Sequence, residues 1–217
     1  MNINKLLQIG IVNTVRINSH YFGIKGILRP VILVGRHTKI GKLSGKIVVN
    51  ESYVGMVTYG LGHVGIVDNK YRRSMLENTG VITFSGKAHF GPGTRITCAG
   101  DLTFGNNAAV NANSDIVCNK EIHIGNDFLM SWECLLMDTD YHAIYAKSDM
   151  TKRINDDKPI TIGNHVWVGC RSIVLKGSSI SDGNVVAAGS IVTGKLEHND
   201  CIYASDEIMK QEIYWSL

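Results

Sequence analysis

Apolar residues recur at every sixth position over about half of the chain. The series from Ile162 to Val192 is unbroken, and similar series lie upstream of it. Seventeen positions follow this spacing, and every one is aliphatic, Met or Phe: Phe84, Phe90, Ile96, Leu102, Phe104, Val110, Ile116, Ile122, Ile124, Met130, Leu136, Ile162, Val168, Val174, Ile180, Val186 and Val192. In a chain with 44% apolar residues, chance would produce this roughly once in a million trials, before the freedom to choose the frame is counted.

A six-residue period excludes the two simple elements, because a helix repeats every 3.6 residues and a strand every two. It fits a chain that turns a corner every six residues, three times per coil, so that short strands stack around an apolar core. The sequence therefore predicts an all-β fold, a parallel β-helix of hexapeptide repeats. Shifts of two residues after Leu102 and after Ile122 predict coils of about twenty residues there. Glycine after the inward residue, as at Gly163 and Gly169, predicts corners with positive φ.

The chain divides into regular and irregular parts within a single domain of residues 1–217. Residues 84–195 form the regular β-helix. Residues 1–83 resemble the regular part in composition but lack its six-residue period, and they show no helical pattern. We therefore expect irregular coils there. Residues 139–159 are polar and free of hexads, which predicts a protruding loop. Residues 205–217, with acidic residues before apolar Ile208, Met209 and Ile213, predict a short helix that caps the open coil end.

The charges are nearly balanced, with 22 Lys and Arg against 19 Asp and Glu, and no run of basic residues stands out. This pattern gives no reason to expect nucleic acid or a membrane surface as a partner. The N-terminal segment contains no long apolar block, so we expect no signal peptide, no membrane insertion and a cytoplasmic protein.

Five cysteines occur without C-x-x-C spacing, which predicts reduced and buried thiols. Cys98 and Cys118 are twenty residues apart. The repeat would therefore stack them on neighbouring coils.

The ladder of Ile124, Met130 and Leu136 continues to His142, an ionisable residue at the start of the polar loop. Asp138 and Asp140 are close enough in sequence for a carboxylate or a main-chain carbonyl to hold one imidazole nitrogen. The other nitrogen would then be free to take a proton. His142, with Asp140 and Asp138 beside it, is therefore the candidate catalytic group, and an ordinary loop histidine is the alternative.

Around this histidine the chain resembles a known family. The segment DTDYHAIY, followed by RINDDKPITIGNHVWVGCRSIVLKGSSISDGNVVAAGSIVTG, is similar to the left-handed β-helix acetyltransferases, and among them to the O-acetyltransferases of bacterial surface polysaccharides. The similarity covers residues 84–195. It implies left-handed winding, and transfer of an acetyl group from acetyl-CoA to a sugar hydroxyl of a surface polysaccharide or its precursor.

The resemblance also implies roles for residues at matching positions. His142 takes the place of the catalytic histidine that activates the acceptor hydroxyl. Asn111 matches a residue near the acceptor, and Trp167 matches one beside the acetyl-CoA channel. Cys170 and Ala188 fall where main-chain groups meet the pantetheine arm. The candidates for the coenzyme A phosphates are Lys176, Lys195 and Lys210.

The implied reaction needs no covalent enzyme intermediate and no metal. A flat-walled β-helix encloses little, so we expect a homotrimer with clefts between chains, in which His142 and Trp167 come from different subunits. The chain departs from the family at YASDEIMK, where Asp206 and Glu207 would repel the 3′-phosphate of coenzyme A.

Other function classes are less consistent with the sequence or stay open. Metal-dependent hydration, as in the γ-class carbonic anhydrases, needs two histidines five residues apart, and no pair of the eight histidines has that spacing. A non-catalytic β-helix scaffold would not need an irregular loop that carries D-x-H. N-acetylation of an amino sugar or antibiotic stays open, since the same base would serve an amine.

Overall fold

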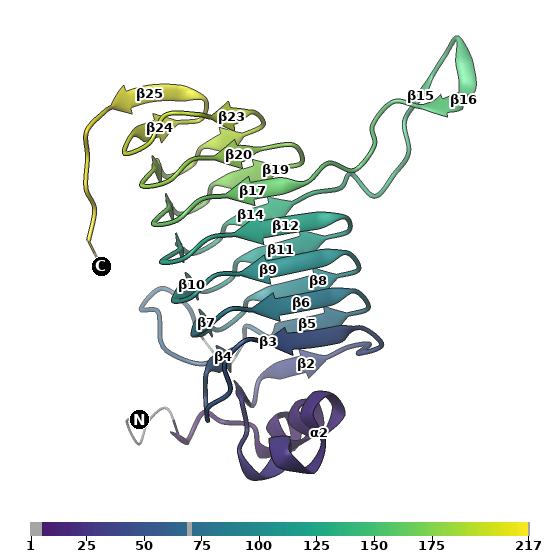
Figure 1. Ribbon diagram of the computed structural model, residues 1–217, viewed down its shortest axis with the longest axis vertical. Coiled ribbons are helices and arrows are strands. Elements are labelled where there is room, and N and C mark those ends of the chain that lie inside the picture. Colours follow the sequence, from purple (N-terminus) through teal and green to yellow (C-terminus); the bar gives the residue numbers. More distant parts are fainter. Residues whose placement is uncertain (1–5, 69–70, 217) are drawn as a thin grey trace.

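The computed structural model describes residues 6–68 and 71–216 of the chain. Most of its strands belong to three parallel sheets, which form the sides of one three-sided column (Figure 1). Successive strands fall on successive sheets, so three strands make one coil. This is a parallel β-helix, as the six-residue period predicts.

We number the sheets I to III. Sheet I contains β1 (Ile32–Val34), β4 (Val57–Tyr59), β7 (Ala88–Phe90), β10 (Ala108–Val110), β13 (Leu129–Met130), β18 (Trp167–Val168), β21 (Val185–Val186), β24 (Ile202–Ala204) and β25 (Glu207–Lys210). Sheet II contains β2 (Thr38–Ile40), β5 (Ser74–Asn78), β8 (Arg95–Cys98), β11 (Asp115–Cys118), β14 (Leu135–Met137), β19 (Ile173–Leu175) and β22 (Ile191–Val192). Sheet III contains β3 (Lys46–Val49), β6 (Val81–Phe84), β9 (Asp101–Phe104), β12 (Glu121–Ile124), β17 (Ile160–Ile162), β20 (Ser179–Ile180) and β23 (Lys195–Leu196).

The six-residue ladder forms the core of the column. All seventeen of its residues are buried. They stack directly, because neighbouring strands of sheet III align Phe84, Phe104, Ile124, Ile162 and Ile180 in one row. Burial of an aliphatic or Phe side chain contributes about 1.5–3 kcal/mol, so the ladder is the main source of stability in the column.

The two-residue shifts of the ladder have a structural cause. Strand β9 points two side chains inward, Leu102 and Phe104, and β12 does the same. Ala88 pairs with Ala108, so a coil in this region is twenty residues long. The longer coils are confirmed, and their extra length lies in sheet III.

The corners use left-handed backbone, but not at the glycines expected from the sequence. Between sheets I and II, positive φ occurs at equivalent positions of successive coils: Gly93, Asn113, Glu133, Arg171 and Gly189. Gly163 and Gly169 lie outside this set, so the expectation for them is wrong. A Cβ at Gly169 would stand 2.6 Å from the nitrogen of Ala188 on the next coil. Close stacking of the coils, rather than φ, therefore excludes a side chain there.

The N-terminal part also differs from the expectation, because it contains a helix. Helix α2 (Ile11–Leu28) closes one end of the column and is kinked at Gly23 (Figure 1). The side-chain amide of Asn18 donates to the carbonyl of Ile32 at 2.7 Å and accepts its N–H at 3.1 Å. Thr14 accepts the N–H of Val34. The helix thus turns polar side chains towards the edge strand β1, which is the reverse of the usual amphipathic pattern.

The C-terminal end has a hairpin where a helix was expected. Residues 205–216, all of them described, contain no helix, and β25 pairs antiparallel with β24. The hairpin covers the last edge of sheet I, so it does the capping that we assigned to a helix. The chain then turns back along the column, where Trp215 stacks on His165 with ring centroids 4.1 Å apart.

The protruding loop is present between β14 and β17. It carries an antiparallel hairpin of β15 (Tyr145–Ala146) and β16 (Asp149–Arg153), which extends away from the column (Figure 1). The column continues past the loop without interruption, since Ile122 pairs directly with Ile160.

Candidate functional site

His142 lies on the loop that leaves the column at the corner between sheets II and III. Its side chain is exposed, as are those of its two neighbours in sequence. Its main-chain N–H donates to the carbonyl of Asp140 over 2.6 Å. Within the described part of the chain, the imidazole has no hydrogen-bond partner. Both ring nitrogens are therefore available to a second molecule.

Asn155 organises the turn around His142 from the returning side of the loop. Its amide nitrogen donates to the carboxylate of Asp140 at 2.8 Å and to the carbonyl of His142 at 2.9 Å. Its amide oxygen accepts the N–H of Ile144 at 2.7 Å. One side chain thus binds the backbone at and just after the histidine and the carboxylate of Asp140 before it. Asn155 was not singled out from the sequence, where its only signal is its place in the segment RINDDKP.

Asp140 joins the loop to the column. Its carboxylate accepts a hydrogen bond from the ammonium of Lys176, which also donates to the carbonyls of Asn155 and Asp156. The ammonium of Lys176, and then the amide of Asn155, hold the pKa of the Asp140 carboxyl below its usual value. Lys176 is thus a loop anchor in this structure, and its ammonium is not available to the coenzyme A phosphate expected from the sequence.

Asp138 is fully buried beneath the loop. Its carboxylate accepts three main-chain N–H groups at 2.7–2.8 Å, from Asn119, Lys120 and Glu121. It therefore ties β14 to a corner of the preceding coil. Neither Asp138 nor Asp140 holds the ring of His142, so the expected orientation of the imidazole by these carboxylates does not occur in this structure.

Four other candidate residues lie together on a different part of the column. Asn111, Cys170 and Ala188 follow strands of sheet I, at its corner with sheet II. Trp167 precedes this corner on β18 and is half-buried. Its indole nitrogen donates to the hydroxyl of Ser131 at 2.9 Å. We call Asn111, Trp167, Cys170 and Ala188 the corner wall.

The C-terminal segment flanks the corner wall. The indole nitrogen of Trp215 donates to the carbonyl of His165 at 2.9 Å, and the carbonyl of Trp215 lies 2.9 Å from Nε2 of His165. The rings of Trp215 and Trp167 have centroids 5.9 Å apart. Trp215 was missed in the sequence because it falls in the segment assigned to a capping helix.

A single chain does not bring His142 to the corner wall. The loop leaves the column between sheets II and III, whereas the wall stands between sheets I and II. The width of sheet II therefore separates the two halves of the candidate site.

The three outer faces of the column differ in chemistry. Outward positions of sheet III are polar: Thr103, Glu121, His123, Thr161, Ser179 and Lys195. Outward positions of β10, β13, β18 and β21 on sheet I and of β14 and β19 on sheet II are apolar: Ala109, Leu129, Trp167, Val185, Leu135, Met137, Ile173 and Leu175. The earlier strands β8 and β11 of sheet II also carry Arg95 and Asp115 outward. Contiguous apolar surface of this kind marks contact with another molecule.

Two of the candidate phosphate ligands lie towards the C-terminal end. Lys195 is exposed on sheet III, and Lys210 is exposed on β25. Asp206 and Glu207 are exposed at the start of the same hairpin strand. The acidic pair that departs from the family pattern therefore shares the surface with Lys210.

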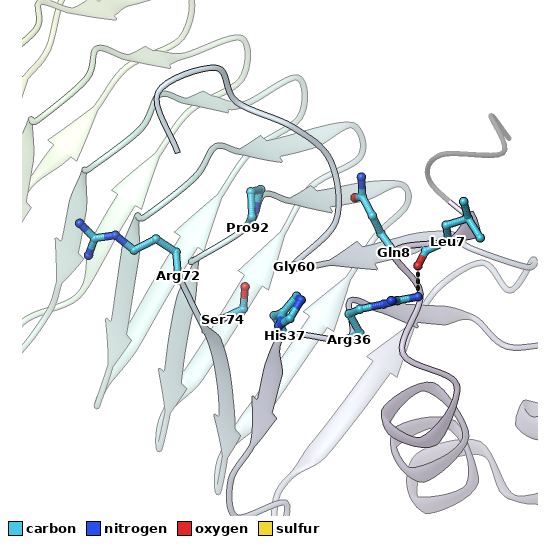
Figure 2. Close-up of a pocket in the computed structure, with 8 residues that line it drawn as sticks. All are labelled: Leu7, Gln8, Arg36, His37, Gly60, Arg72, Ser74 and Pro92. Atoms are coloured by element: carbon cyan, nitrogen blue, oxygen red, sulfur yellow. Dashed lines mark hydrogen bonds between the residues drawn. The ribbon is translucent and has the colours of Figure 1, made fainter. Parts of the chain in front are cut away.

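A pocket of about 200 Å³ lies at the corner of sheets I and II near the N-terminal end (Figure 2). Gln8, His37 and Pro92 help to line it, and Arg36 beside it donates to the carbonyl of Leu7. None of the candidate catalytic or cofactor residues lines this pocket. The candidate site is therefore the loop and the corner wall, not this hollow.

Among residues 6–68 and 71–216, no group of three or more His, Cys, Asp or Glu side chains is arranged to hold a metal ion. The same residues form no helix that is long and apolar enough to span a bilayer.

All five cysteines are free, as expected, and only Cys170 is partly exposed. Cys98 and Cys118 are register partners on β8 and β11. Hydrogen bonding between their thiols lowers the pKa of Cys98 and raises the pKa of Cys118. Both side chains are buried in the column, so they serve as small packing residues there.

Known proteins resemble the chain in sequence and in fold, although no family model matches it. It is 28% identical to the galactoside O-acetyltransferase of Escherichia coli strain K12, over 65% of this chain and 68% of that protein. It is 40% identical to the polysialic acid O-acetyltransferase of Neisseria meningitidis over 57 residues, which are 26% of each chain. The crystal structure of the polySia-specific acetyltransferase NeuO matches 85% of this chain and 80% of its own, with a TM-score of 0.67 and 24% identity. The resemblance seen in the sequence is thereby confirmed: the relatives of the chain are O-acetyltransferases of polysaccharide and galactoside type, and the chain is an acyltransferase built on a left-handed β-helix.

Proposed function

We propose that the protein transfers the acetyl group of acetyl-CoA to a hydroxyl of a bacterial surface polysaccharide or its precursor. The observation that carries this proposal is the exposed imidazole of His142, whose main-chain carbonyl accepts a hydrogen bond from Asn155, on a chain related to O-acetyltransferases. A neutral imidazole without an internal partner has a free ring nitrogen that can take the proton of a hydroxyl. A loop histidine with no function would not need a side chain that binds the backbone at and just after it.

The proposed reaction uses His142 as a general base. Its neutral ring takes the proton of the acceptor hydroxyl while the oxygen attacks the acetyl carbonyl carbon. Main-chain N–H groups stabilise the tetrahedral oxyanion. The intermediate collapses to the acetyl ester, and the departing thiolate of coenzyme A receives the proton from the imidazolium. No covalent enzyme intermediate is needed, and base catalysis of this kind contributes about 10²–10⁴-fold.

The corner wall is the proposed path of the cosubstrate. In the described residues, the main-chain N–H groups of Cys170 and Ala188 donate to no backbone carbonyl, so both can donate to the amides of a pantetheine arm. Trp167 offers an apolar ring beside them. Lys195 and Lys210 are the remaining candidates for the phosphates, while Asn111 lies at the acceptor end of the wall.

We further propose a homotrimer in which the loop of one subunit meets the corner wall of the next. Two observations support this arrangement. The outward positions of sheets I and II are apolar on β13, β14, β18 and β19, whereas those of sheet III in the same coils are polar. The loop itself exposes apolar side chains, with Tyr145 43%, Met150 68% and Ile154 57% exposed. Contact between copies of the chain would cover both surfaces and bring the two halves of the site together.

Subunit mixing tests the shared site. His142→Ala and Asn111→Ala should each be nearly inactive, with release of free thiol from acetyl-CoA in the presence of saccharides as the readout. If the residues come from different subunits, equal mixing and reassembly should restore about one quarter of the wild-type rate, because one interface in four then holds both intact halves. A mixture of His142→Ala with His142→Gln is the matched control and should stay inactive.

The outcomes separate the parts of the proposal. A stable and active monomer would reject the shared site while leaving the base intact. Equal rates in wild type and His142→Ala would reject the histidine as the base. Thiol release with amino sugars alone would assign the transfer to nitrogen instead of oxygen.

A further inference from the structure

The helix that closes the N-terminal end of the column turns most of its aliphatic side chains outward, with Ile17 as a buried exception. Ile11, Val12, Ile24 and Leu28 are 74–80% exposed. The preceding residue Leu7 is 64% exposed. The aliphatic side chains face outward because the inner face of the helix carries Thr14 and Asn18, which make polar contacts with β1. Its outer face is left as an apolar end surface of the column.

Basic side chains share this end surface. Arg16, Lys25 and Arg29 are exposed on α2 or immediately after it. We call these three residues, together with Ile11, Val12, Ile24 and Leu28, the cap surface. Four more exposed basic residues surround the first coil next to it, on sheets II and III and at the corners of sheet II: Arg36, Lys39, Lys42 and Lys46.

The nearly balanced charge of the whole chain does not reveal that basic residues are concentrated at this end. Eight of the 22 Lys and Arg residues fall within residues 1–50, and none of the 19 Asp and Glu residues does. The first acidic residue of the chain is Glu51. The rest of the molecule therefore carries more acidic than basic residues, and the column is electrically polarised along its length.

We propose that the cap surface docks the protein peripherally on an anionic membrane. Exposed aliphatic side chains flanked by Lys and Arg are the features that place a helix in the interface of an anionic bilayer. The helices of the described residues cannot span a bilayer, so the attachment is to the surface. This surface is separate from the loop and the corner wall, and the inference does not depend on the acetyl transfer proposed above.

Charge decides between the membrane and other occupants of the cap surface. A second copy packed cap to cap would bring Arg16, Lys25 and Arg29 against the same residues, and like charges oppose each other. Nucleic acid would match the charge but leave the aliphatic side chains without a partner. An anionic bilayer satisfies both kinds of side chain.

The position of the cap fixes how the protein would stand on the bilayer. Helix α2 lies at one end of the column, while the loop with β15 and β16 leaves it much nearer the other end (Figure 1). The column would stand away from the membrane, with the acidic remainder of the chain distant from the anionic headgroups.

Vesicle cosedimentation tests the proposal on the intact protein. Vesicles of phosphatidylcholine with phosphatidylglycerol should carry the wild type into the pellet at low salt, and vesicles of phosphatidylcholine alone should carry much less. A triple variant, Arg16→Gln with Lys25→Gln and Arg29→Gln, should lower partitioning to the anionic vesicles about a hundredfold. A second triple variant, Val12→Ser with Ile24→Ser and Leu28→Ser, should lower it by about tenfold or more.

Matched controls lie away from the cap surface. Met150→Ser with Ile154→Ser and Met209→Ser removes side chains that are 57–68% exposed, and Lys87→Gln with Lys147→Gln removes exposed basic charge. Both controls should bind vesicles as the wild type does, and circular dichroism should show all variants folded. Wild-type protein that stays in the supernatant with anionic vesicles, or cap variants that bind as well as the wild type, would overturn the proposal. Two other results, each without vesicle binding, would also overturn the proposal. One is a doubled mass by light scattering that the cap variants abolish, and the other is binding of duplex DNA that the cap variants abolish.

Discussion

The column and the loop that leaves it are stabilised in different ways. In the column, the apolar ladder is buried and every coil is aligned with its neighbours. In the loop, most side chains are exposed, and the backbone depends on a few polar contacts of Asn155, Asp140 and Lys176. Burial of apolar side chains thus stabilises the column, whereas a small number of polar contacts hold the loop. Substitutions in the two parts should therefore change different measurements.

A core substitution should give the largest change. Ile124→Ala removes a fully buried side chain from the row in sheet III, so the free energy of unfolding should fall by about 2–5 kcal/mol. Ile154→Ala is the matched control, because the same change at a 57% exposed position of the loop should stay within about 0.5 kcal/mol. Chemical denaturation measures both. Equal losses would contradict the division between column and loop.

Loss of the buried carboxylate of Asp138 should give the second-largest change and define the boundary between the column and the loop. Asp138→Ala leaves the N–H groups of Asn119, Lys120 and Glu121 without their acceptor, and should cost about 2 kcal/mol of unfolding free energy. Asp140→Ala, two residues farther on, removes partly exposed contacts with Lys176 and Asn155 and should change stability by less than about 1 kcal/mol. Thermal melts of the two variants should therefore differ. The reverse order would place Asp138 in the loop and not in the column.

The smallest expected effect lies in the loop. Asn155→Ala should leave thermal unfolding unchanged and lower kcat by about tenfold, since a misplaced base is a less effective one. Free thiol release measures the rate, and limited proteolysis should show faster cleavage within residues 139–159. Lys147→Ala, on the same loop, is the control and should affect neither readout. An unchanged rate in Asn155→Ala would show that the turn around His142 needs no clamp.

The periodic part of the fold was predictable from sequence, and the ends were not. The ladder could be located because an apolar residue every six positions reports directly on a repeated inward direction. Helix α2 escaped notice because it buries Thr14 and Asn18 and exposes aliphatic residues, so the usual apolar stripe is missing. The C-terminal hairpin was mistaken for a helix because both elements can cover a strand edge.

The position of the loop was easier to predict than the contacts of its residues. The loop could be placed because it interrupts the repeat, whereas the residues of the corner wall were named from the resemblance to a family. The contacts of Asp138 and Lys176 could not be predicted, because nearness in sequence says little about where a side chain points once a loop leaves the column. The basic cap surface was hidden for a simpler reason, since acidic residues elsewhere in the chain balance its charge.

The pairing of Ile122 with Ile160 has a consequence for how such a protein can change. Sheet III keeps its register across the loop of residues 139–159, so the column itself tolerates changes in the length of that loop. Closing a longer loop costs little additional free energy, about 0.6 kcal/mol of lost entropy for each doubling of its length. New substrate specificities could thus arise when this loop is exchanged between proteins that share the β-helix, with no rearrangement of the apolar core.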